Sequence, residues 1–151
     1  MKAEFDLLSA TRVVVLKLVN ELSLAQLNTV PNGYSNSIVW NVAHILVTQQ
    51  ILHYKFSFND LLVPDDLLEK YKKGTTFEEA ISASEWSIIL DLFNSLPEKL
   101  QLDYSKGKFS SYETYLTSYG YEIHSIEEAI AFNNVHEAVH LGYIMAMKKL
   151  I

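Results

Sequence analysis

Hydrophobic residues recur with a helical period through most of the chain, and this periodicity limits the fold more than any other feature of the sequence. A first helix is predicted for about residues 3–22, where one apolar stripe contains Phe5, Leu8, Val15, Leu18 and Leu22. Similar spacing predicts helices over about residues 37–57, over about residues 76–95, and from Ser125 to the end of the chain. Four long helices in 151 residues predict an all-α fold, an antiparallel four-helix bundle, in a single domain spanning residues 1–151.

Local signals define the ends of three of these helices. The stretch LNTVPNGYSN interrupts the first pattern, and Asn36 or a neighbouring Ser is the expected cap of the second helix. Pro97 is expected to end the third helix, because proline lacks the backbone N–H that a helix interior needs. Ser125 and Glu128 have the spacing of a capping box, which predicts the start of the fourth helix.

The segment LDYSKGKFSSYETYLTSYGYEIH, between the third and fourth helices, contains five of the nine tyrosines. It is expected to be a loop or irregular extended chain. Tyr115, Tyr119, Tyr121 and Ile123 alternate with smaller or polar residues, so a short hairpin also fits, although Gly120 weakens a strand. The tyrosines either close over a functional site and contact substrate or fill the end of the bundle, and the sequence favours neither.

Composition argues against several classes of function. The chain has no cysteine, so disulfides, thiolate ligands and a catalytic thiol of its own are excluded. Glu4 and Asp6 stand where a signal peptide would have its apolar region, and no apolar run approaches the roughly 20 residues of a membrane span. We therefore expect a cytoplasmic protein that does not bind membranes. A net charge of -6 argues against nucleic-acid binding, because acidic residues offset the basic cluster KYKK at 70–73.

The sequence HEAVH near the C-terminus matches H-E-x-x-H, a pattern of zinc peptidases. His136 and His140 lie one turn apart on a helix, so their imidazoles can share one metal ion. Zinc peptidases with this motif take a third ligand from downstream of the second histidine. Only LGYIMAMKKLI follows His140, and it contains no His, Asp, Glu or Cys. An ordinary peptidase is therefore excluded, and the third ligand must precede the motif.

Helix geometry ranks the remaining histidines as the third ligand. His44 lies on the apolar face of the second helix, beside Trp40 and Val47, and is expected to point into the bundle toward the fourth helix. His53 is displaced from His44 by about half a turn around the helix, which excludes it from the same site unless the helix is kinked. His124 precedes the fourth helix and is expected in a loop or at a rim, where it remains an alternative ligand.

A histidine on an apolar helix face is more often a hydrogen-bonded core residue than a metal ligand. That interpretation suits one histidine, but burying several imidazoles together is costly unless something satisfies them. Metal binding by His44, His136 and His140 is therefore favoured. Three imidazoles suit zinc, nickel, iron or copper, and three protein ligands leave coordination positions open for a reactant.

The segments SIVWNVAHILV and HEAVHLGYI together resemble the DinB-like superfamily, whose members are four-helix bundles with a three-histidine metal site. The residues that match the family pattern are Trp40, His44, His136, Glu137, His140 and Gly142. Tyr143 departs from it, because many members have Gln there, and this would alter specificity if that position contributes to the pocket or to a subunit contact. The resemblance implies a divalent ion, zinc or nickel, and a homodimer.

Three functions remain open. The resemblance implies a metal-dependent S-transferase or isomerase that transfers a low-molecular-weight thiol to an electrophile, so a small thiol and an electrophilic substrate are the expected partners. A second function is a metal-dependent hydrolase in which water is the nucleophile and Glu137 is the catalytic base. A third is a non-catalytic, stress-related metal-binding bundle.

Polar residues beside the candidate ligands have two interpretations each. Glu137 is either a base or a residue that orients a ligand or caps a surface. Asn41 and Asn133 each lie three residues before a candidate ligand. Each of them either holds a ligand ring in place or is an ordinary polar position.

Overall fold

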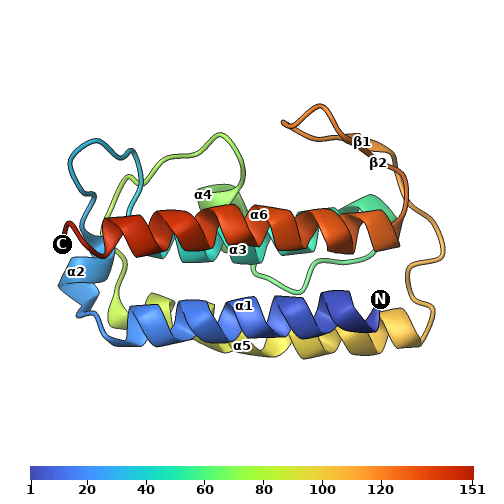
Figure 1. Ribbon diagram of the computed structural model, residues 1–151, viewed down its shortest axis with the longest axis horizontal. Coiled ribbons are helices and arrows are strands. Elements are labelled where there is room, and N and C mark those ends of the chain that lie inside the picture. The colour runs from blue at the N-terminus through green and yellow to red at the C-terminus, as the bar shows by residue number, and fades with distance from the viewer.

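The computed structural model describes all 151 residues and is mostly helical (Figure 1). Its four long helices are α1 (Lys2–Asn20), α3 (Ile38–His53), α5 (Ala83–Ser105) and α6 (Ile126–Met147). The connections contain α2 (Leu24–Asn28), α4 (Asp65–Tyr71) and one turn of 3-10 helix, η1 (Lys55–Ser57). The expectation of a helical fold is confirmed, and no helix is both long and apolar enough to span a membrane.

The long helices lie side by side, but they are not all antiparallel (Figure 1). α6 packs against α3 and α1, and α5 packs against the same two helices. Asn41 near the start of α3 contacts Met147 at the end of α6, so this pair is antiparallel. α1 and α6 instead run in the same direction, as do α3 and α5 (Figure 1). Residues 54–82 carry the chain back along the molecule before α5 begins, and the expected antiparallel order therefore applies to only two of the neighbouring pairs.

α5 corrects the prediction of a third helix over about residues 76–95. It begins later, after Ser82, whose hydroxyl accepts a hydrogen bond from the backbone N–H of Glu85. It also continues past Pro97, which lies inside the helix. Proline cannot donate to the carbonyl oxygen four residues earlier, which belongs to Phe93. The guanidinium of Arg12, on α1, donates to that oxygen at 3.0 Å, so a long-range bond compensates for the proline and the helix continues.

The starts of α3 and α6 agree with the sequence signals, because both depend on local bonds. Ser37 precedes α3, and its hydroxyl accepts a hydrogen bond from the backbone N–H of Trp40. Ser125 precedes α6 and accepts from the N–H of Glu128 in the same way. Each bond satisfies one of the N–H groups that a helix leaves unpaired at its start. The predicted capping box is only half formed, because the carboxylate of Glu128 accepts from the N–H of His124 rather than from that of Ser125.

The only sheet is a hairpin of β1 (Tyr115–Leu116) and β2 (Glu122–Ile123), which are antiparallel. Gly120 lies in the turn with a φ of 75°, a conformation that glycine adopts without steric cost. The hairpin folds back beside α6 (Figure 1), and Ile123 is buried in a small cluster with Leu52. The short hairpin considered from the sequence is therefore present.

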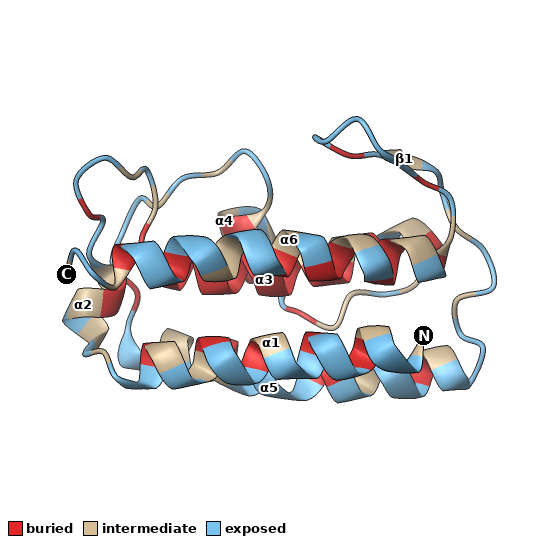
Figure 2. Ribbon diagram, viewed as in Figure 1, coloured by how far each residue is buried: buried red, intermediate tan, exposed pale blue.

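α3 is the most buried of the long helices, and its position explains why a functional site can form along it (Figure 2). Nearly all of its residues are buried, because α6, α5 and α4 cover it from different sides. Its inward residues belong to the main hydrophobic cluster, together with Val15 of α1 and Phe93 of α5. Most polar residues on α3 are consequently buried, and Thr48 is the half-buried exception.

Candidate metal centre

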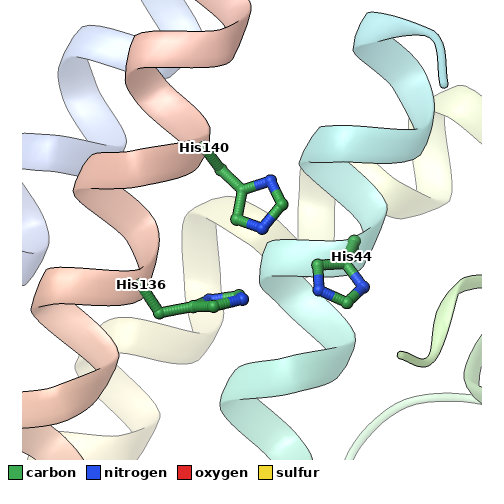
Figure 3. A group of neighbouring side chains, drawn as sticks. All are labelled: His44, His136 and His140. Carbon is green, nitrogen blue, oxygen red and sulfur yellow. The ribbon is translucent and has the colours of Figure 1, made fainter. Parts of the chain in front are cut away.

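Three histidines meet where α3 and α6 pack together (Figure 3). His44 comes from α3, and His136 and His140 come from successive turns of α6. One ring nitrogen of each lies within 4.8 Å of one of each of the others. The ring centroids of His136 and His140 are 4.6 Å apart, and that of His44 lies 5.3 Å and 4.9 Å from them. The group that helix geometry selected from the sequence is thus assembled, and it could bind a metal ion.

Hydrogen bonds fix the orientation of two of these rings. Nδ1 of His44 lies 2.7 Å from the backbone carbonyl oxygen of Tyr71, which can only accept, so this nitrogen carries the proton. Nδ1 of His140 lies 2.8 Å from Oδ1 of Asn41. The amide of Asn41 is oriented by its nitrogen, which donates to the carbonyl of Ser37 at 2.8 Å. Both rings therefore keep the lone pair on Nε2, the arrangement usual for metal-binding histidines.

His136 lacks such a partner. Its Nδ1 is buried and has no hydrogen bond. A buried polar atom without a partner is costly, so the His136 ring is less well satisfied than the other two. The three rings therefore differ in their support, because His44 and His140 are each fixed through Nδ1 and His136 is not.

All three imidazoles are held in the neutral form. Burial lowers the pKa of His136 to about 3 and that of His140 to about 4, and repulsion from the neighbouring histidines adds to both shifts. Burial also lowers the pKa of His44, although the hydrogen bond to Tyr71 partly opposes it. The indole of Trp40 stacks on His44 at 4.5 Å and contributes to this burial. Neutral imidazole is the form that binds a metal ion, so no proton has to be displaced at pH 7.

A small cavity borders the histidines on one side, and we call it the hairpin cavity. Its volume is about 80 Å³, and His44 and His136 form part of its wall. The segment between α5 and α6 covers it through Tyr115, Thr117 and Ser118. Lys73, Thr48, Ile51, Leu52 and Phe132 complete the lining. Tyr115 of the tyrosine-rich segment thus borders the candidate site, whereas Tyr119 and Tyr121 are exposed.

A larger cavity of about 620 Å³ borders His140 on another side, and we call it the aromatic cavity. Trp40, Tyr34 and Tyr143 contribute to its lining, together with Met147. Tyr34 and Tyr143 are in edge-to-face contact, with ring centroids 6.1 Å apart. Tyr143, the residue that departs from the family pattern, thus lines a cavity beside the histidines.

Glu137 lies between the two histidines in sequence but does not line either cavity. Its carboxylate is fully buried and accepts two hydrogen bonds of 2.7 Å from the guanidinium of Arg12, on α1. It also accepts a hydrogen bond of 2.8 Å from Asn133. Gln49 and the ring of Phe93 contact the same guanidinium. The carboxylate predicted as a catalytic base is thus engaged in an ion pair with another helix.

The other two histidines lie outside the group. His53 is fully buried at the far end of α3, and burial lowers its pKa to about 3. His124 is exposed beside the hairpin, where its side chain contacts Thr114 and Glu122. Both positions agree with the sequence analysis, which placed His53 half a turn from His44 and His124 at a rim.

Sequence reasoning missed several residues that shape the site. The carbonyl of Tyr71 orients His44 but carries no side-chain signal, so only the fold reveals it. Lys73 was treated only as part of a basic cluster. Arg12 did leave a signal, because it falls in the apolar stripe of α1 between Leu8 and Val15. A charged residue at such a position requires a buried partner.

Comparison with known proteins agrees with this geometry. A model of the DinB superfamily matches residues 7–144. Among solved structures, a conserved protein from Enterococcus faecalis is similar over 99% of this chain and 95% of its own, with a TM-score of 0.71 and 11% identity. At that identity the similarity shows the fold alone. No curated protein matches the sequence.

Proposed function

The chain belongs to the DinB superfamily, and from this premise we propose that it is a metal-dependent enzyme that transfers a low-molecular-weight thiol to an electrophile. We propose further that residues 1–151 form a single four-helix-bundle domain that acts in the cytoplasm. The observation that carries the proposal is the group of three neutral imidazoles with cavities on two sides. Each part of this arrangement supports a different aspect of the reaction.

His44, His136 and His140 would hold the ion. The partners of Nδ1 on His44 and His140 leave the lone pair of each ring on Nε2. The Thr48 hydroxyl lies 3.3 Å from Nε2 of His44, and it would rotate away to leave that lone pair to the ion. Nitrogen donors without carboxylates suit zinc or nickel better than magnesium or calcium. When bound, such an ion supplies a positive charge that lowers the pKa of a thiol in contact with it.

Two separate cavities suit a reaction between two different molecules. The hairpin cavity reaches His44 and His136, whereas the aromatic cavity reaches His140. Two reactants can therefore approach the same three histidines from different sides. A hydrolase needs only one organic substrate besides water, so the paired cavities favour transfer over hydrolysis.

The surroundings of Glu137 also favour thiol transfer over the hydrolase alternative. A general base needs a free carboxylate within hydrogen-bond reach of the water that it activates. The carboxylate of Glu137 instead accepts bonds from Arg12 and Asn133 and is closed off from solvent. With a thiol as the nucleophile, no carboxylate base is required, because a bound metal ion would lower the pKa of the thiol enough for its proton to pass to solvent near neutral pH.

We propose that the protein is a homodimer through the outward face of α1 and α6. Large apolar side chains are exposed there, at Leu7, Val135 and Val139. A shallow cavity between the two helices is lined mainly by these residues and by Ala131 and Ala138. Light scattering should give about twice the monomer mass of 17.2 kDa at micromolar concentration, and Val139→Glu should restore the monomer mass. A wild-type protein that scatters as a monomer would refute the dimer.

The metal assignment is tested by elemental analysis of protein purified without a histidine tag, followed by zinc titration against a chelator. His44→Ala, His136→Ala and His140→Ala should each lower zinc affinity by more than about 100-fold, since each removes a ligand rather than a supporting residue. His124→Ala is the matched control and should bind zinc as the wild type does. A wild-type protein that takes up no metal would contradict the metal-dependent enzyme and favour a non-catalytic bundle.

The reaction is tested with the metal-loaded protein by screening small thiols against model electrophiles. The ligand variants should be inactive. Glu137→Gln, assayed at a temperature where it remains folded, should retain both metal and most of its activity. A hydrolase that uses Glu137 as base would instead lose about 10²–10⁴-fold in rate. Turnover of esters or amides without a thiol would overturn the thiol assignment.

A further inference from the structure

Lys73 is the one lysine or arginine that lines the hairpin cavity. No Asp or Glu lines this cavity. The net charge of the whole protein is nevertheless -6. A positively charged cavity wall in an acidic protein indicates a local preference for an anion.

Lys73 differs from the neighbouring lysines in having no acidic partner. Lys70 pairs with Glu85 at 2.9 Å, and Lys72 pairs with Glu69. Lys73 forms no ion pair and no side-chain hydrogen bond. Its side chain is exposed at the edge of the cavity rather than buried. The ammonium group is therefore available to a ligand that enters there.

Two hydroxyl groups in the lining of the same cavity supply further hydrogen-bond donors. Thr117 is buried, and its oxygen already accepts bonds from the backbone N–H groups of Tyr119 and Tyr121. Its own hydroxyl hydrogen is left to donate to another acceptor. Ser118 adds a second hydroxyl beside it. One cation and two hydroxyls around a narrow space match the acceptor oxygens of a carboxylate.

We propose that the hairpin cavity is the subsite for the thiol reactant, and that Lys73 binds a carboxylate carried by this thiol. The inference rests on the proposed thiol transfer and specifies its substrate class. A thiol held at Lys73 by its carboxylate would share this cavity with His44 and His136, where the sulfur is needed. Ile51, Leu52 and Phe132 add apolar lining that suits a short hydrocarbon linker.

The electrophile belongs to the other cavity. The aromatic cavity is larger, and it presents Trp40, Tyr34 and Tyr143 beside His140. No lysine or arginine lines it. The aromatic rings suit a flat or apolar molecule, and the wall lacks the cation that would pair with a carboxylate. The division of charge between the cavities thus assigns the anionic reactant to the hairpin side.

The experiment compares two thiols of similar size, 3-mercaptopropionate and the uncharged 2-mercaptoethanol. Binding to the cobalt-loaded protein is followed by the thiolate-to-cobalt charge-transfer band. The wild type should bind 3-mercaptopropionate about tenfold more tightly than 2-mercaptoethanol, the usual size of one charged hydrogen bond. Lys73→Gln should abolish this preference without changing the affinity for 2-mercaptoethanol. Lys72→Gln makes the same change in net charge at the adjacent residue and should leave the preference intact.

A second measurement separates the subsite from the proposed function. In metal-free protein, 3-mercaptopropionate should shift the backbone amide resonances of Thr117 and Ser118, and Lys73→Gln should weaken this binding. Lys73-dependent shifts without a charge-transfer band would support the subsite and overturn the thiol chemistry. A band with equal affinity for both thiols, unchanged in Lys73→Gln, would overturn the subsite and leave the proposed function standing. Absence of both signals would overturn both.

Discussion

Two faces of α6 present opposite chemistry, although their residues belong to the same HEAVH motif. His136 and His140 face α3, where neutral imidazoles border two cavities. Glu137 faces α1, where its charge is fully buried against Arg12. The histidine face can therefore still bind a ligand, whereas the polar groups of the Glu137 face are already paired with other protein groups.

The difference follows from where the neighbouring helices lie. Successive residues on a helix are about 100° apart, so Glu137 lies about 60° from His140 and about 100° from His136. Because α6 packs against both α3 and α1, that rotation is enough to turn a side chain from one neighbour to the other. A sequence motif consequently fixes which residues share a face but not which helix that face meets.

The two faces also differ in what burial demands of them. A buried carboxylate requires an opposite charge and several hydrogen bonds, and Glu137 has both. A buried imidazole can remain neutral, which leaves its lone pair for another ligand. The charge of Arg12 is the smallest of the causes that lower the pKa of His136, and burial is the largest.

The largest expected effect tests whether the Glu137 face is structural. Arg12→Ala removes the partner of a fully buried carboxylate and also the donor to the Phe93 carbonyl. It should lower the free energy of unfolding of the metal-free protein by about 3–5 kcal/mol, measured by urea denaturation. His136→Ala, on the other face, should cost only about 1 kcal/mol in the same assay, as typical substitutions do.

A double replacement provides the control for this comparison. Arg12→Met combined with Glu137→Leu removes both charges and should recover most of the lost stability, because no unpaired charge remains. Folded Arg12→Ala should still bind zinc. Loss of metal binding with the fold intact would show that the two faces act as one unit.

The contrast between local and long-range bonds explains how much of the fold was predictable. The starts of α3 and α6 were predictable because Ser37 and Ser125 bond to residues three positions away. The continuation of α5 past Pro97 was not predictable. Pro97 leaves the Phe93 carbonyl without its helical partner, and Arg12 on another helix donates to it instead. The directions of the helices also depend on the path of residues 54–82, which have little periodic pattern of their own.

The candidate site also has features that the sequence predicts and features that depend on long-range packing. Helix spacing and the apolar stripe of α3 were enough to select His44, His136 and His140 from five histidines. The partner of Glu137 was not predictable, because it lies 125 residues away in sequence. The two cavities are formed by loops and a hairpin, whose placement has no counterpart in the periodicity of the sequence.

Two asparagines in equivalent sequence positions allow a finer test of the difference between the two faces, with a smaller expected effect. Asn41 and Asn133 are both buried, and each lies three residues before a candidate ligand histidine. Asn41 accepts the Nδ1 proton of His140, whereas Asn133 donates to Glu137. Asn41→Ala should lower zinc affinity by about 10–100-fold, the usual effect of losing the residue that orients a ligand. Competition with a chromogenic chelator measures this loss.

Asn133→Ala is the matched control, because it removes the same amide from the same depth on the other face. It should leave zinc affinity within about twofold of the wild type and lower the free energy of unfolding by about 1–3 kcal/mol, since it removes one bond to a buried carboxylate. Asn41→Asp keeps an acceptor for the His140 proton and should restore most of the affinity lost in Asn41→Ala. Equal losses of affinity in Asn41→Ala and Asn133→Ala would show that the asparagines act by supporting α6 in general. The separation of the helix into a metal-binding face and a structural face would then be wrong.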